Sequence, residues 1–195
     1  MSRFITEAEQ ALIDIIKPLN TAKWKADYRW DMLESAITKL GEDYGSLDMC
    51  PDFQRGHVWT PDQQRHYIEN CLRGVVSSAG LLIQFSCSSW AEQDIETDLP
   101  SGLLCLDGLQ RFTAITEFAK GNITPFGLTM AELDGTQFGI KRFYVKVAIH
   151  SFTRRADLLE NYLALNAGGT QHSPDEIARV RALLAKEKEL KGSKQ

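Results

Sequence analysis

A short apolar run that leads through an Asp-Gly pair into a helical pattern most constrains the fold of this chain. The length and composition of Leu103–Leu106 predict a buried strand. Asp107 and Gly108 follow as a tight turn, and apolar residues then recur with helical spacing up to a capping glycine, Gly121. A helix that begins directly after such a turn offers unpaired backbone N–H groups and partial positive charge. The segment therefore predicts an anion-binding turn.

The side chains around this turn suit a phosphate and a metal ion. Gly108 lets a ligand approach the backbone, Gln110 adds a donor, and Arg111 can bind a phosphate through two hydrogen bonds. Asp107 supplies a carboxylate, which suits Mg²⁺, a ribose or a water molecule. The alternative is an ordinary turn followed by a solvated arginine, since short motifs of this kind often occur by chance.

Composition indicates an ordinary globular protein. The 195 residues are 43% hydrophobic and 25% charged, which fits one domain or one domain with a helical appendage. The formal net charge of −4 argues against a sequence-blind DNA binder but leaves room for a local basic patch. We recognise no signal peptide, long apolar span or lipidation motif, so we expect a cytoplasmic protein with no membrane contact.

The four cysteines do not have the spacing of a zinc site. No Cys-x-x-Cys motif or paired histidines accompany them, which disfavours a structural zinc site. Cys105 lies within the central apolar strand and is expected to be a small buried side chain.

Periodicity predicts further elements on both sides of the central segment. The expected helices are Glu7–Lys17, Arg29–Leu40 with Gly41 as its cap, Thr60–Gly74, Met130–Leu133, Thr153–Leu165 and Pro174–Leu190. The expected strands are Tyr44–Met49, Leu81–Phe85 and Phe143–Ile149, and Thr21–Tyr28 is expected to be a connection. We expect the strands at 81–85, 103–106 and 143–149 to share one sheet, with the helix at 109–120 packed against it.

Two other segments are candidates for the site. Phe53 and Trp59 bracket Gln54 and Arg55, an arrangement that could hold the arginine rigidly; alternatively the aromatic residues and Val58 are core and the arginine merely packs over Trp59.

The second segment is a glycine turn, Asn166–Thr170, which leads into a capping box at Ser173–Glu176. A Gly-Gly loop ahead of a capped helix can present backbone donors, so we expect it near Arg55 or Asp107. The alternative is a plain connection between helices.

Three blocks in this order resemble one family. They are Phe53-Gln54-Arg55 with Val58-Trp59, Leu106-Asp107-Gly108-Leu109-Gln110-Arg111, and Leu165-Asn166-Ala167-Gly168-Gly169-Thr170 with Ser173 and Glu176. Together they resemble the N-terminal domain of GmrSD-type (type IV, modification-dependent) restriction enzymes, in the ParB/sulfiredoxin-like superfamily. On this basis residues 1–43 form an N-terminal helical segment, 44–184 the ParB/sulfiredoxin-like domain and 185–195 a charged tail.

The resemblance implies an α+β fold, a small mixed sheet with packed helices and with additional N-terminal and C-terminal helices. It also implies a nucleotide at the start of the central helix and nucleoside triphosphate hydrolysis coupled to action on DNA. Gly108 and Arg111 match the Gly-x-x-Arg pattern that contacts nucleotide phosphates in ParB-type relatives. The implied catalytic residues are Asp107, Arg111 and Arg55, with Asp107 also holding Mg²⁺. The implied nucleotide-binding residues are Gly108, Gln110, Arg111, Gln54, Asn166, Gly168, Gly169 and Thr170.

The chain also departs from the family pattern. Leu109 stands where the family usually has a second glutamine, and the turn lacks the reactive cysteine of sulfiredoxins. His57, His66, His150 and His172 are scattered and form no recognisable nuclease motif, so we expect any nuclease domain to come from a protein partner.

Two functions therefore stay open. The first is a Mg²⁺-dependent nucleoside triphosphatase linked to DNA processing or restriction, for which positioning and charge neutralisation suffice. The second is a non-catalytic module that docks on DNA or on a restriction or partition complex. A nuclease acting alone is disfavoured, because the sequence shows no cluster of metal-binding carboxylates or histidines.

Overall fold

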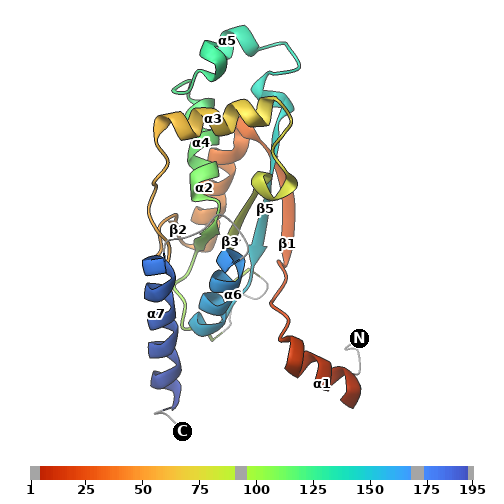
Figure 1. Cartoon of the computed structure of the whole chain (residues 1–195), viewed down its shortest axis with the longest axis vertical. Coiled ribbons are helices and arrows are strands. Elements are labelled where there is room, and N and C mark those ends of the chain that lie inside the picture. The colour runs from red at the N-terminus through yellow and green to blue at the C-terminus, as the bar shows by residue number, and fades with distance from the viewer. Residues whose placement is uncertain (1–4, 91–95, 168–173, 193–195) are drawn as a thin grey trace.

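The computed structural model describes residues 5–90, 96–167 and 174–192, and these residues form the α+β fold with a mixed sheet that the sequence predicts (Figure 1). The sheet has five strands in the order β1-β5-β3-β4-β2. They are β1 (Trp24–Arg29), β2 (Leu47–Asp48), β3 (Leu82–Ser86), β4 (Leu103–Asp107) and β5 (Tyr144–His150). β1 and β5 pair antiparallel, as do β3 and β4, whereas β3 with β5 and β2 with β4 are parallel.

Helices surround this sheet. They are α1 (Glu7–Ile16), α2 (Leu33–Tyr44), α3 (Pro61–Leu72), α4 (Leu109–Ala119), α5 (Met130–Leu133), α6 (Arg155–Ala167) and α7 (Pro174–Gly192). The described residues also form 3₁₀ turns at Trp30–Met32, Ser78–Leu81, Pro125–Gly127 and Ile140–Arg142. A capping box of Thr60 with Gln63 starts α3, which lies within the predicted helix Thr60–Gly74.

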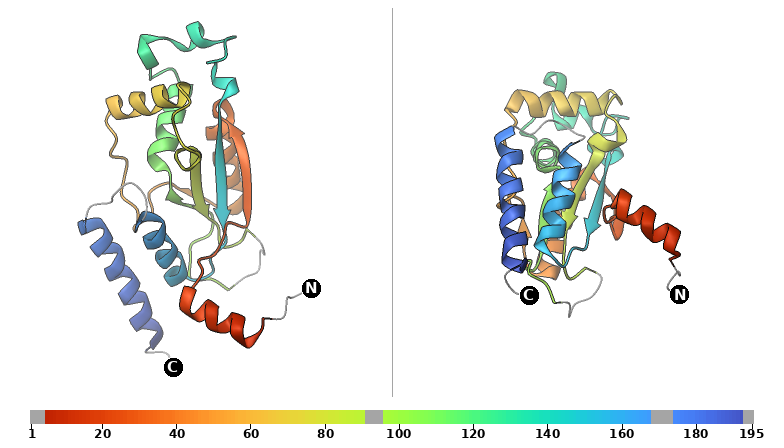
Figure 2. Two further views of the ribbon diagram at one scale, coloured as in Figure 1. Left: turned by 45° about the vertical axis from the view of Figure 1, so that its right-hand side comes forward. Right: turned by 60° about the horizontal axis from the view of Figure 1, so that its bottom comes forward.

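The central prediction is confirmed, because β5, β3 and β4 are neighbours in one sheet and β4 continues through Gly108 into α4. Alternate side chains of β4 point to opposite faces. Leu103 and Cys105 belong to a core cluster shared with α2, α3 and α4. Leu104 and Leu106 belong to a second cluster, formed with α6 and α7, which run side by side (Figure 2). Strand β4, which leads into α4, therefore contributes side chains to both clusters.

The expected connection at Thr21–Tyr28 is wrong, because most of it forms strand β1. Its side chains alternate between half-buried and exposed, and Trp24 packs against Trp90 with the ring centroids 5.2 Å apart. The polar residues between the aromatic ones hide this alternation in the sequence. Pairing with β5, at the edge of the sheet, makes the segment a strand.

The expected end of the second helix at Gly41 is also wrong. The helix starts later, after the 3₁₀ turn, and runs on to Tyr44, with Gly45 at φ +116° as its C-cap. Gly41 lies inside the helix, where an added Cβ would come 2.7 Å from Leu47 Cβ. This glycine therefore permits close approach of α2 to β2 and does not cap the helix.

Helix α1 projects from the body of the molecule (Figure 1). Thr6 is the N-cap of α1, but the apolar residues of this helix, Leu12, Ile15 and Ile16, are exposed. In the described part of the chain, no helix is both long and apolar enough to cross a bilayer.

Candidate functional site

A cavity of about 620 Å³ opens where β4 passes into α4. It is lined by residues of β3, β4, the first turn of α4, the segment 54–59 and α6. Its size is in the range of small-molecule binding sites. The cavity brings together Arg55, Asp107, Gly108, Arg111 and Asn166, which the sequence placed in one site.

Gly108 makes the turn possible for two reasons. Its φ of +103° lies in the left-handed region that disfavours residues with a Cβ. An added Cβ would also lie 3.0 Å from Ile83 Cα, on the neighbouring strand β3. A register shift between Gln84 and Phe85 of β3 marks an irregularity in the sheet beside this turn. The local backbone is therefore tightly constrained where it faces the cavity.

The first turn of α4 contains backbone N–H groups that no carbonyl of the helix accepts. Its first intrahelical hydrogen bond runs from Phe112 N to Gly108 O at 2.8 Å. The N–H groups of residues 109–111 precede that bond and so have no acceptor within the helix. Such donors and the positive end of the helix dipole attract anions in general, and anion binding at this turn stays a prediction.

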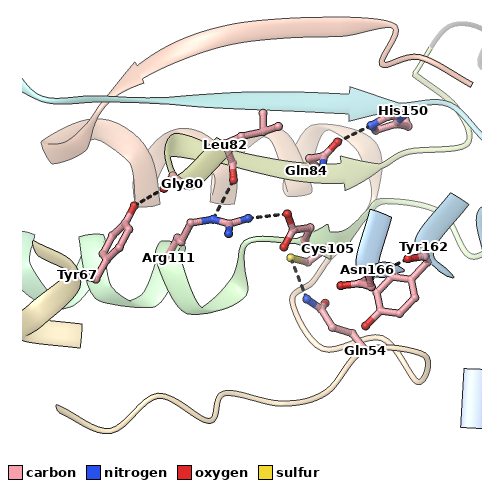
Figure 3. Close-up of polar contacts among 11 residues, drawn as sticks. Gln54, Tyr67, Gly80, Leu82, Gln84, Cys105, Arg111, His150, Tyr162 and Asn166 are labelled. Carbon is pink, nitrogen blue, oxygen red and sulfur yellow. Dashed lines mark hydrogen bonds and ion pairs between the residues drawn. The ribbon is translucent and has the colours of Figure 1, made fainter. Parts of the chain in front are cut away.

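Arg111 is fixed by two contacts at the cavity wall (Figure 3). Its Nη2 lies 2.6 Å from Asp107 Oδ2, and its Nε donates to Leu82 O at 3.0 Å. The side chains are 17% and 36% exposed for Arg111 and Asp107 respectively. Arg111 is thus not the solvated helix residue of the alternative interpretation.

Gln110 uses its amide to hold the segment ahead of α3. Its Nε2 donates to Gly56 O at 3.1 Å, and its Oε1 accepts from Val58 N and Trp59 N, each at 3.0 Å. Sequence reasoning missed these three contacts. Gln110 as a direct nucleotide ligand stays a prediction, to which the structure adds a bridging role.

Gln54 points toward β4 (Figure 3). Its Nε2 lies 3.7 Å from Cys105 Sγ, and with the amide turned over its nitrogen donates to Cys105 O at 2.7 Å and Met49 O at 3.2 Å. Burial raises the pKa of the Cys105 thiol to about 12, so the thiol is neutral near pH 7. Cys105 is therefore the buried small side chain that the sequence predicts.

Arg55 faces the first turn of α7. Its Nη1 lies 3.6 Å from Glu176 Oε2, and both side chains are about a quarter exposed. Phe53 is buried in the core and packs against Tyr162 with the ring centroids 5.1 Å apart, as the core interpretation expects. Val58 is wrongly assigned to the core by that interpretation, because it is 51% exposed.

The glycine turn is described only at its start. Asn166 belongs to helix α6 and lines the cavity. Its Nδ2 donates to Tyr162 O at 2.7 Å. Its position in the same cavity as Arg55 and Asp107 agrees with the expected proximity. Gly168, Gly169, Thr170 and Ser173 lie outside the described residues.

Two buried polar side chains, Gln84 and His150, were not predicted as part of the site. Gln84, on β3, lines the cavity and its Oε1 lies 3.1 Å from His150 Nε2 (Figure 3). Burial lowers the pKa of His150; a hydrogen bond with the Asn20 backbone partly opposes this, and the charge of Lys25 adds to the lowering. A glutamine within an otherwise apolar strand is the one sequence signal that points to this pair.

Among the described residues that line this cavity, Asp107 is the one carboxylate that could bind a metal ion. Among the described residues, no group of three or more His, Cys, Asp or Glu side chains could enclose a metal. Mg²⁺ often binds through one or two carboxylates together with substrate phosphates. The donor set therefore fits Mg²⁺ that arrives with a phosphate ligand, and does not fit a metal site made of protein side chains alone.

The fold and this cavity define an α+β domain with a mixed sheet and a cavity at the start of helix α4. Residues 33–146 match the family model described as the GmrSD restriction endonuclease, N-terminal domain, and the chain belongs to that family. This membership connects the chain with restriction and DNA processing. The match includes the blocks at 53–59 and 106–111, while the block at 165–170 lies beyond it. Neither curated proteins nor solved structures yielded a match.

Proposed function

We propose that this domain binds a nucleoside triphosphate at the start of α4 and hydrolyses it with Mg²⁺ as part of DNA processing. The observation that carries the proposal is that the Gly108 turn, the first turn of α4 and Arg111 line one cavity of about 620 Å³. Helix N–H groups and an arginine are complementary to phosphate oxygens.

The charge of each residue determines its proposed role. The N–H groups of the first turn and Arg111 hold phosphate oxygens, and Arg55, which lines the same cavity, adds a second guanidinium. Asp107 holds Mg²⁺ or orients a water molecule. Bound with the nucleotide, Mg²⁺ supplies charge neutralisation for phosphoryl transfer. We also propose that the domain is of ParB/sulfiredoxin-like ancestry and that a protein partner supplies a nuclease domain.

A non-catalytic module that docks on DNA or on a restriction complex is the second candidate. It is favoured by the contact of Asp107 with Arg111, which engages the carboxylate needed for catalysis, and by Leu109 at the usual glutamine position.

A calorimetric titration with the four triphosphates, each with and without Mg²⁺, tests the proposal. We expect saturable binding and Mg²⁺-dependent release of phosphate. Binding without turnover would support the docking module, and no binding of any triphosphate would overturn the nucleotide site.

A further inference from the structure

Trp59 is the less buried of the two aromatic residues that line the described part of the cavity. Of the described residues that line it, Trp59 and Tyr162 are aromatic. Tyr162 is 1% exposed and packs against Phe53, so it has no free face. Trp59 is only partly buried. An aromatic face in a polar cavity is suited to a flat, conjugated ligand group.

The backbone and ring of Trp59 are both held in place. Its N–H donates to Gln110 Oε1 at 3.0 Å, which joins it to the first turn of α4. Its ring packs against Tyr67, with the centroids 5.4 Å apart, and the Tyr67 hydroxyl donates to Gly80 O at 2.8 Å. Gly80 lines the same cavity. A ring fixed in this way gives up little side-chain entropy when a ligand stacks on it.

The residues that line the cavity are of two chemical kinds. Gly108, with the first turn of α4 and Arg111, suits phosphate. Trp59, with Ala79 and Gly80, suits a base. A nucleotide has the same division between its triphosphate and its base.

We propose that the base of the bound nucleotide stacks on the indole of Trp59, while its phosphates lie at the start of α4. This inference rests on the proposed function and specifies how the ligand is oriented. Gln110 acts through the Trp59 segment as a positioning residue.

Comparing a nucleoside triphosphate with inorganic tripolyphosphate tests the orientation, because only the first has a base. We expect Trp59→Leu to weaken the affinity for the nucleotide about 5- to 150-fold, the range for aromatic stacking on bases, and to leave tripolyphosphate binding unchanged. Trp59→Phe should restore part of the loss. Trp24→Leu, which removes a half-buried tryptophan on β1, should change neither affinity. Calorimetry is the readout, since it does not depend on tryptophan fluorescence.

The outcomes separate this inference from the proposed function. If Trp59→Leu binds the nucleotide like the parent, or loses tripolyphosphate to the same degree, stacking is overturned while the phosphate site stands. If the parent protein binds neither ligand, the phosphate site is overturned and the stacking falls with it.

Discussion

Arg111 and Asp107 face each other across the first turn of α4, with Nη2 and Oδ2 only 2.6 Å apart. The residues expected to bind phosphate and metal are therefore bonded to one another. A phosphate that reaches Arg111 competes with the Asp107 carboxylate for the same guanidinium. The roles of the two residues should consequently be separable by substitution.

Asp107→Asn should bind nucleotide without Mg²⁺ at least as tightly as the parent, because the competing negative charge is gone. It should also lose Mg²⁺-dependent hydrolysis, since a neutral amide is a poor Mg²⁺ ligand. Calorimetry in a chelating buffer and a phosphate-release assay measure the two effects. Asp62→Asn is the control, because Asp62 forms an exposed i,i+3 pair with Arg65 on α3. Parental turnover by Asp107→Asn would show that this carboxylate is not catalytic.

Arg111→Ala should weaken nucleotide binding both with and without Mg²⁺. Hydrogen bonds to charged groups contribute about 1.5–3 kcal/mol, so the dissociation constant should rise roughly 10- to 150-fold. The melting temperature reports separately on the lost bond to Leu82 O. Arg65→Ala removes an exposed arginine and should leave binding unchanged. An Arg111→Ala protein that is folded and binds like the parent would argue against the phosphate site.

Gly108→Ala should destabilise the fold more than Gly121→Ala. Both glycines have positive φ, so each substitution costs about 1–2 kcal/mol from backbone strain. Only at Gly108 does the new Cβ meet the β3 backbone, at 3.0 Å from Ile83 Cα, whereas nothing lies within 4 Å at Gly121. Overpacking adds about 1–3 kcal/mol. Urea unfolding of both variants at one pH measures the loss of unfolding free energy. Equal losses would mean that the backbone of β3 shifts to accept the new Cβ at no cost.

Acidification should destabilise the protein partly through His150. Its pKa is lowered in the folded state by burial, so the unfolded chain binds more protons as the pH falls below about 6.5. The free energy of unfolding should therefore fall between pH 7.5 and 5.5. His150→Gln should show a smaller fall than the parent, and His66→Gln, at an exposed position, should match the parent. Identical pH dependence in all three proteins would contradict a buried neutral histidine.

Local patterns in the sequence determined the central part of this fold. The apolar run, the Asp-Gly turn and the helical spacing after it predict β4, the turn and α4, because each depends on neighbouring residues. The capping box at Thr60 is local in the same sense. Strand β1 was missed because it is an edge strand with a mixed polar sequence, and its pairing partner lies far along the chain.

Only the tertiary structure decided what the site side chains contact. The sequence places Gln110 beside Arg111 as an equal donor, yet its amide bonds to backbone 52 positions away. Arg55 faces Glu176 of α7, and Gln84 faces His150 of β5, through packing that no local period encodes. A short motif fixes backbone conformation because steric and helix-end effects act between neighbours. The partners of polar side chains depend on which distant strands and helices pack together, and that is settled by the burial of apolar faces across the whole domain.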